Sequence, residues 1–276
     1  MTIAVSLKVN DGVVLAADSA STLAGIDANG QVVVFNVYKS ANKIFNLYKG
    51  LPIGVVTWGT GAFGNASIER LVKDFRQELK AKLDPEKYAL EDVASEFRRF
   101  MYEDNFLPAF GGSTSKGDEL RTGFILAGYS SGGQMAEEYQ IDMTPKECDK
   151  PQLVRPVDDS GIAWNGQPEA ITRLLKGFGS GLGPTLAKLG MAPDEVQPAV
   201  AALQEHLQAP LVQPGMPFQD AIDLATFLVD TTVNFVRFSP GADTVGGPVD
   251  VAGITKHEGF KWIKRKHYYR RDLNPD

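Results

Sequence analysis

Two short apolar runs at the start of the chain, joined by a tight turn, constrain the fold more than any other feature. Residues 2–9 and 13–17 have the apolar patterning of strands, and the Asn-Asp-Gly turn at 10–12 tolerates the positive φ that hairpins need. Strands of similar length return Asp18 to the side of Thr2. The sequence therefore predicts a carboxylate beside a threonine that becomes the amino terminus once the initiator methionine is removed.

Composition narrows the class of protein. A chain of 276 residues with 43% hydrophobic content can bury one large core or two modest ones. Its formal net charge of -6 calls for neither nucleic acid nor a membrane as a partner. One cysteine, Cys148, excludes an intramolecular disulfide, and its polar neighbours indicate an inert thiol. Because no apolar run is membrane-spanning and no basic leader is present, we expect a cytoplasmic protein whose Thr2 is exposed by simple methionine removal.

Small residues and further strands follow the hairpin. Residues 19–25 are predicted to pass close to Thr2, and a strand is predicted at 31–35. Lys43 then precedes an alternating segment. A buried strand at 51–57 ends in Trp-Gly-Thr-Gly, where Gly59 could leave a backbone amide facing an oxyanion or could simply form a turn.

Helices are predicted from apolar side chains at 3.6-residue spacing and from start signals, at residues 66–83, 90–102, 168–176 and 218–238. Between them we expect a hairpin at 121–142 and a strand at 161–164. Helices that follow a sheet indicate layers packed on one another. Residues 178–217 indicate a helical insertion with a Gly-rich connector and an added helix at 192–208. The connector lacks the Lys-Ser or Lys-Thr of a phosphate-binding loop.

The run from Gly12 to Ser19, Gly-Val-Val-Leu-Ala-Ala-Asp-Ser, resembles the N-terminal signature of proteasome β-type subunits, which are N-terminal-nucleophile hydrolases. The resemblance covers residues 2–176 and 218–255 and implies a divergent bacterial proteasome homologue. It implies an α+β fold, a four-layer αββα sandwich of two antiparallel sheets, with 1–276 as a single domain. Such relatives are implied to form rings around an inner chamber. Where the family has Arg, this chain has Ala20, which removes a charge close to the site.

The resemblance also implies catalytic roles for single residues. Thr2 is the nucleophile, and its free α-amino group, with an ordinary pKa of ~7.7 to 8.0, is the base. Lys43 matches the lysine beside the nucleophile, where its charge favours the neutral amine. Asp18 holds that lysine charged and oriented. Gly59 matches the residue whose amide stabilises the oxyanion.

Further positions match the substrate side and the support of the site. Ser21 and Thr22 match the strand along which family substrates lie, and Val56 matches the floor of the first specificity pocket. Asn165 matches the place of a hydroxyl or amide near the nucleophile, although a helix cap is an equal interpretation. Asp243 lies near the family's Asp that orients the terminal amine.

The expected activity is that of a threonine-type peptidase or amidase acting on peptide or unfolded protein. Two alternatives stay open: a ring-forming chamber with little peptidase activity, which Ala20 and the insertion favour, and an N-terminal-nucleophile amidase for a small amide. The sequence names no unfoldase partner. The three histidines lack metal-ligand spacing, so we expect neither a metal nor a cofactor.

The segment at 261–271 alternates basic and aromatic residues, within a basic tail at 261–276. Such interleaving can stack bases and neutralise phosphates. No nucleic-acid-binding module accompanies it, so a final strand or a docking segment for an acidic subunit is the preferred interpretation.

Overall fold

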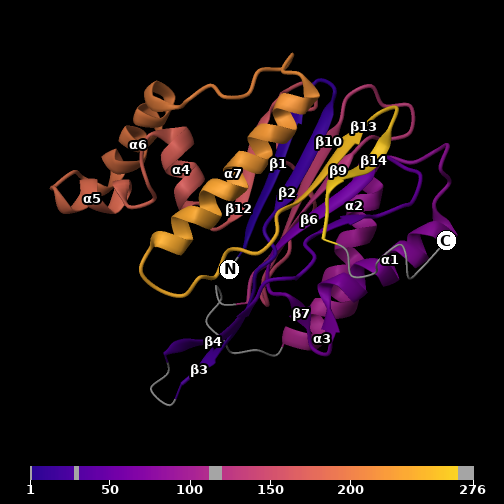
Figure 1. The fold of residues 1–276 in the computed structure, drawn as a ribbon, viewed down its shortest axis with the longest axis horizontal. Helices are drawn as coiled ribbons and strands as arrows, with labels where there is room; N and C mark the ends of the chain where they lie inside the picture. The colour runs from indigo at the N-terminus through magenta and orange to yellow at the C-terminus, as the bar shows by residue number, and fades with distance from the viewer. Residues whose placement is uncertain (1, 28–30, 112–119, 267–276) are drawn as a thin grey trace.

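The computed structural model describes residues 2–27, 31–111 and 120–266, which form a mixed α/β fold with antiparallel sheets (Figure 1). Within these ranges the first five-stranded sheet has the order β12 (Gly161–Gly166), β1 (Ile3–Val9), β2 (Gly12–Ala17), β13 (Asp250–Thr255) and β14 (Gly259–Lys264). The second has the order β11 (Gln152–Leu153), β10 (Glu137–Met143), β9 (Thr122–Gly128), β6 (Ile53–Gly59) and β5 (Ile44–Asn46). Two small sheets pair β3 (Ser21–Ile26) with β4 (Val32–Tyr38) and β7 (Ala62–Phe63) with β8 (Ala66–Ser67).

The predicted first hairpin is confirmed. Strands β1 and β2 pair from Ala4 opposite Ala17 to Val9 opposite Gly12. Both strands are buried along their whole length because β12 and β13 flank them in the sheet and side chains cover both faces. The hairpin is therefore the centre of the first sheet and fixes where residue 18 emerges.

Three apolar clusters hold the elements together. One packs α1 (Ile68–Lys82) and α2 (Leu90–Arg98) on the second sheet, and another packs α4 (Glu169–Lys176) and α7 (Phe218–Phe238) on the first. A third contains side chains of both sheets, among them Ala4 of β1 and Val56 of β6. Along β1 the alternating residues Ile3, Val5, Leu7 and Val9 belong to the α7 cluster, as a period of two requires.

The helix predicted at 90–102 is wrong over its last four residues, 99–102. After α2 ends at Arg98, residues Arg99–Phe106 form a π-helix, η1, which runs into the short α3 (Leu107–Phe110). Side chains five residues apart meet along this segment: Arg98 donates to Glu103 at 2.7 Å, and Arg99 donates to Asp104 at 2.7 Å. Because η1 does not follow the 3.6-residue pattern, the helical segment predicted from the sequence stopped at residue 102, although η1 continues to Phe106.

The stretch after the first hairpin also differs from expectation. Residues predicted only as a small-residue segment form β3, and β4 is longer than the predicted strand at 31–35. The β3–β4 hairpin projects away from the two large sheets at the lower end of the molecule (Figure 1). Leu23, Phe35 and Tyr38 on it are exposed.

The remaining predicted elements match closely. Helix α7 spans the predicted 218–238, and α5 (Leu182–Lys188) and α6 (Pro193–Leu207) lie within 178–217, whose assignment as an insertion stays a prediction. Strand β14 takes up the first part of the basic tail, while residues 267–276 lie outside the described part. No helix in the described residues is long and apolar enough to cross a membrane.

Candidate functional site

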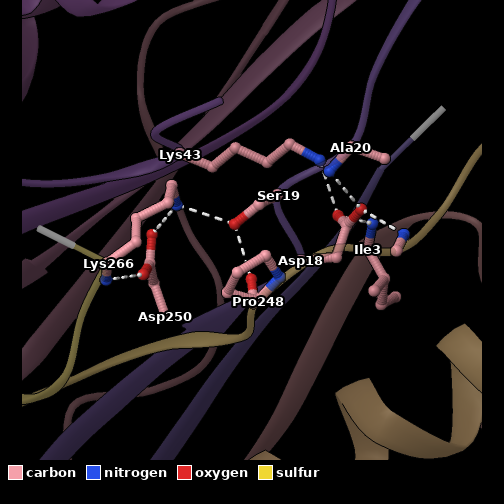
Figure 2. Close-up of polar contacts among 9 residues, drawn as sticks. Ile3, Asp18, Ser19, Ala20, Lys43, Pro248, Asp250 and Lys266 are labelled. Atoms are coloured by element: carbon pink, nitrogen blue, oxygen red, sulfur yellow. Dashed lines mark hydrogen bonds and ion pairs between the residues drawn. The ribbon is translucent and has the colours of Figure 1, made fainter. Parts of the chain in front are cut away.

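Asp18 follows directly after β2 and collects hydrogen bonds from distant parts of the chain (Figure 2). Its side chain is fully buried. One oxygen, Oδ1, accepts from the backbone N–H of Ile3 at 3.0 Å and from Lys43 Nζ at 2.6 Å. The other, Oδ2, accepts from the N–H groups of Ala20 and Gly246, each at 2.9 Å. These donors fix the carboxylate at the junction of four segments.

Lys43 is the charged partner of Asp18 and lies just before β5. Its side chain is 7% exposed, so the ion pair is held away from water. Burial lowers the pKa of the Lys43 ammonium below its ordinary value, while the charge and hydrogen bond of Asp18 act to raise it. The Lys43 carbonyl accepts from Thr57 N–H at 3.0 Å, which ties this residue to β6.

Thr2 is buried at the start of β1, with 4% of its surface exposed. Its carbonyl accepts from the N–H of Gln167 at 2.7 Å. Gly166 is needed beside it, because the residue has φ +98° and an added Cβ would lie 2.0 Å from the Thr2 carbonyl oxygen. Since Asp18 accepts from the next residue, Ile3, the sequence prediction that Asp18 lies beside Thr2 agrees with this register.

Gly59 is the last residue of β6. The Lys43 carbonyl accepts from the Thr57 N–H, and Gly59 lies two residues along β6 from Thr57. Its φ is +92°, and an added Cβ would lie 2.0 Å from the Arg121 carbonyl oxygen. A side chain is therefore excluded at this position. Whether its amide faces an oxyanion stays a prediction.

The residues expected on the substrate side lie in two places. Ser21 and Thr22 begin β3 and pair with Tyr38 and Val37 of β4. Val56 is fully buried opposite Ile44, in the apolar cluster formed by both sheets. Full burial does not favour the expected contact of Val56 with substrate, and the three assignments stay predictions.

Among the described residues, neither Asn165 nor Asp243 is a hydrogen-bond partner of the Asp18 carboxylate. Asn165 pairs with Ala4 in the β1–β12 ladder. The alternative interpretation of Asn165 as a helix cap is wrong, because Pro168 precedes α4 and no side chain caps that helix. Asp243 forms an exposed ion pair with Lys39 at 2.9 Å. Gly246, three residues further along the chain, donates its N–H to Asp18. The role of Asp243 toward the terminal amine stays a prediction.

A second buried ion pair lies beside the first and was not anticipated. Lys266, just after β14, donates to Ser19 Oγ at 2.7 Å and forms a short ion pair with Asp250 (Figure 2). Ser19 in turn donates to the carbonyl of Pro248 at 2.5 Å. Lys266 and Asp250 are among the charges that act on Lys43: the lysine lowers the pKa of its ammonium and the aspartate raises it. The two ion pairs form one electrostatic unit.

Sequence reasoning missed this pair for an identifiable reason. Lys266 is one of many cations in the basic tail, and it lies 247 positions from Ser19. The one local signal was Asp250, a carboxylate at the start of an apolar strand, where burial requires a partner. The burial of Asp250 predicts a cationic partner but does not identify which cation it is.

A hydroxyl-bearing residue, a buried ammonium and a buried carboxylate lie on neighbouring segments in this part of the structure. Thr2 carries the hydroxyl, and the ion pair between Lys43 and Asp18 holds the cation away from water. A hydroxyl is a weak nucleophile unless a neighbouring base or cation activates it. Among the described residues, no group of three or more His, Cys, Asp or Glu side chains is placed to hold a metal ion. Cys148 is buried and its pKa is raised to about 11 by burial.

No protein-family model matches the sequence, and no curated protein matches it. Among solved structures, it is similar to a chain of the helical assembly of the Anbu complex from Pseudomonas aeruginosa. The identity is 17% and the TM-score 0.49, covering 98% of this chain and 90% of that one. Anbu (ancestral beta-subunit) from Yersinia bercovieri is 14% identical with a TM-score of 0.48, covering 97% and 89%. An Anbu (Gly-1) mutant from Hyphomicrobium sp. strain MC1 is 16% identical with a TM-score of 0.48, covering 99% and 92%.

These comparisons correct the expected kinship. The sequence run from Gly12 to Ser19 resembled proteasome β-type subunits, yet no family model of such subunits matches. The three solved structures described above are Anbu proteins. A run of eight residues at a strand end is too short to separate one family of this kind from another.

Proposed function

We propose that the chain is an amide hydrolase whose nucleophile is the hydroxyl of Thr2, set free at the amino terminus by loss of the initiator methionine. One observation carries the proposal. The Asp18 carboxylate accepts from both Lys43 and the backbone of Ile3, so a buried cation is held next to the second residue of the chain. Buried charges of this kind cluster at functional sites more often than elsewhere.

In the proposed reaction the α-amino group of Thr2 takes the proton from Oγ as that oxygen attacks the carbonyl carbon of the substrate. The positive charge of Lys43 lowers the pKa of the amine and keeps more of it neutral near pH 7. The backbone amide of Gly59 stabilises the tetrahedral oxyanion. The ammonium then protonates the leaving nitrogen, and water attacks the remaining ester to release the acid and restore Thr2.

We further propose that this site belongs to a single domain with the four-layer αββα arrangement, acting on peptide or unfolded protein in a self-assembled particle. The three apolar clusters support the layering. Exposed aromatic residues on α7, Phe227, Phe235 and Phe238, support burial of that face against another copy. A closed ring with an inner chamber is the form of assembly we propose.

Mass spectrometry of the purified protein tests the proposal. Under denaturing conditions the chain is expected to lack Met1, because only then does Thr2 carry the free amine that serves as base. Under native conditions the mass gives the number of copies in the particle. Retention of Met1 in the native host would contradict the catalytic proposal and favour a chamber without peptidase activity.

Lys266→Met is expected to move the pH profile of hydrolysis upward. Lys266 lowers the pKa of the Lys43 ammonium, whereas Asp18 and Asp250 raise it. Loss of the Lys266 charge therefore raises that pKa and, by the same Coulomb sign, the pKa of the nearby Thr2 amine. The acidic limb of the kcat/KM profile reports the Thr2 amine and the basic limb reports the Lys43 ammonium. Both limbs are therefore expected at higher pH.

The matched control is Lys261→Met, since Lys261 is an exposed residue of β14. Its pH profile is expected to coincide with that of the parent. A purely structural role for Lys266 would lower the rate or the stability without moving the limbs, and that result would contradict its action on Lys43.

A further inference from the structure

Basic side chains gather along one side of α1, on a protein whose net charge is negative. A cavity of about 320 Å³ lies between this helix, β5 and β14. Its wall carries four cationic side chains and one carboxylate, together with three aromatic rings: Lys49, Lys73, Arg76, Arg265, Glu69, Phe45, Phe260 and Trp262. A second cavity of about 320 Å³ shares Lys49, Lys73 and Arg76 and adds Lys80. The cavities thus form one basic region.

The two arginines are the central feature of this cavity. Arg265 lies over the ring of Trp262, with its Cζ 4.6 Å from the ring centroid. Arg76 donates from Nη2 to the Asn46 carbonyl, while its Nε is buried and has no partner within the described residues. Both arginines line the same cavity, and burial together with the like charge of Arg265 lowers the pKa of Arg76.

Few carboxylates are available to offset this charge. Glu69 is the carboxylate of the cavity wall, and it pairs with Lys73 at 2.6 Å. Within the described part of the chain, no ion pair involves Lys49, Arg76 or Arg265. Like charges that face one another without a counter-ion destabilise the folded chain, and a bound anion relieves this repulsion.

We propose that this cavity binds the phosphoryl group of a small phosphorylated molecule, held between Arg76 and Arg265. Guanidinium groups present paired N–H donors whose geometry matches a phosphoryl or carboxylate group. A phosphoryl group carries about -1.5 to -2 charges at pH 7, which fits several unpaired cations better than a single carboxylate does. The volume of about 320 Å³ leaves room for more than the phosphoryl group itself.

The cavity shares its backbone with the candidate site. Asn42 and Ile44 line the cavity, and Lys43 between them binds Asp18. Arg265 likewise lines the cavity, and the next residue, Lys266, binds Ser19. A ligand in the cavity would therefore contact the two segments that carry the buried lysines, from their opposite side.

Calorimetric titration of the full-length protein with inorganic pyrophosphate, at fixed ionic strength, tests the site. Saturable binding is expected for the parent protein. Arg265→Gln is expected to weaken it by about tenfold or more, because charge-assisted hydrogen bonds to the anion are lost. Arg76→Lys keeps the charge but removes the paired donors, so it is expected to weaken binding as well.

The control is Arg70→Gln, since Arg70 is also on α1 but pairs with Asp74 and lines neither cavity. Its binding is expected to equal that of the parent. Absence of saturable binding, or an equal loss in Arg70→Gln, would overturn the site. Tighter binding of citrate than of pyrophosphate would overturn the phosphoryl assignment. Because the readout is binding, each of these results is independent of whether Thr2 is catalytic.

Discussion

Thr2→Ala is expected to abolish amide hydrolysis while leaving the particle intact. The change removes the attacking oxygen but keeps a small second residue, so the initiator methionine is still cleaved and the terminal amine stays in place. Loss of the nucleophile is expected to lower kcat by about three orders of magnitude or more. Turnover of a peptide amide with a chromogenic leaving group measures it, with the native mass confirming assembly.

Thr2→Ser is the matched variant, because it keeps a hydroxyl on the same atom and is expected to retain measurable turnover. The pair separates chemistry from folding. If Thr2→Ala hydrolysed the substrate as fast as the parent, another group would be the nucleophile and the proposed function would be wrong. If neither variant nor parent showed turnover although Met1 is absent, a binding chamber would be the better description.

Asp18→Asn is expected to destabilise the fold by about 3 to 5 kcal/mol, the cost of leaving one member of a buried ion pair without its partner. The carboxylate accepts from Lys43 and from the amides of Ile3, Ala20 and Gly246. An asparagine offers one acceptor oxygen, and its NH₂ group would face donors. Chemical denaturation, read as the midpoint at an unchanged slope, measures the change in the free energy of unfolding.

Two further variants decide the cause of that loss. Asp243→Asn breaks an exposed ion pair with Lys39 and is expected to cost less than about 1 kcal/mol. Combining Asp18→Asn with Lys43→Met removes the buried unpaired charge and is expected to recover part of the stability. Equal stability of Asp18→Asn and the parent would show that the Lys43 charge is not buried as described.

Local signals in the sequence predicted much of the fold. The first hairpin and the apolar spacing of α7 each depend on neighbours in the chain, and both were confirmed. The hairpin loop itself is Asn10-Asp11, neither residue has a positive φ, and Gly12 already pairs with Val9 in the ladder. The position of Asp18 after β2 followed from strand length alone. Strand β3 was not predicted, because it forms only by pairing with β4. The helical segment of η1 was predicted incompletely, because it departs from the 3.6-residue period.

In the candidate site, too, contacts between residues close in the sequence could be predicted and contacts between distant residues could not. Asp18 is reached from Ile3 through one hairpin, so its surroundings could be anticipated. Lys266 enters the cluster because β14 pairs with β13 and returns the chain to Ser19. No property of the basic tail by itself distinguishes that lysine from its neighbours. The anion cavity depends on Arg76 and Arg265 in the same way, since only packing brings α1 and the end of β14 together.

The alternation of Asn42, Lys43 and Ile44 ties two surfaces to one register. Asn42 and Ile44 line the basic cavity whereas Lys43 between them binds Asp18, so one side of this segment faces the cavity and the other faces the carboxylate. A one-residue insertion or deletion there would exchange the two faces, placing an amide or an aliphatic side chain against the carboxylate and turning the lysine outward. Arg265 and Lys266 are bound by the same rule. The cavity and the ion pairs can therefore change side chains independently during evolution, but they cannot change length independently.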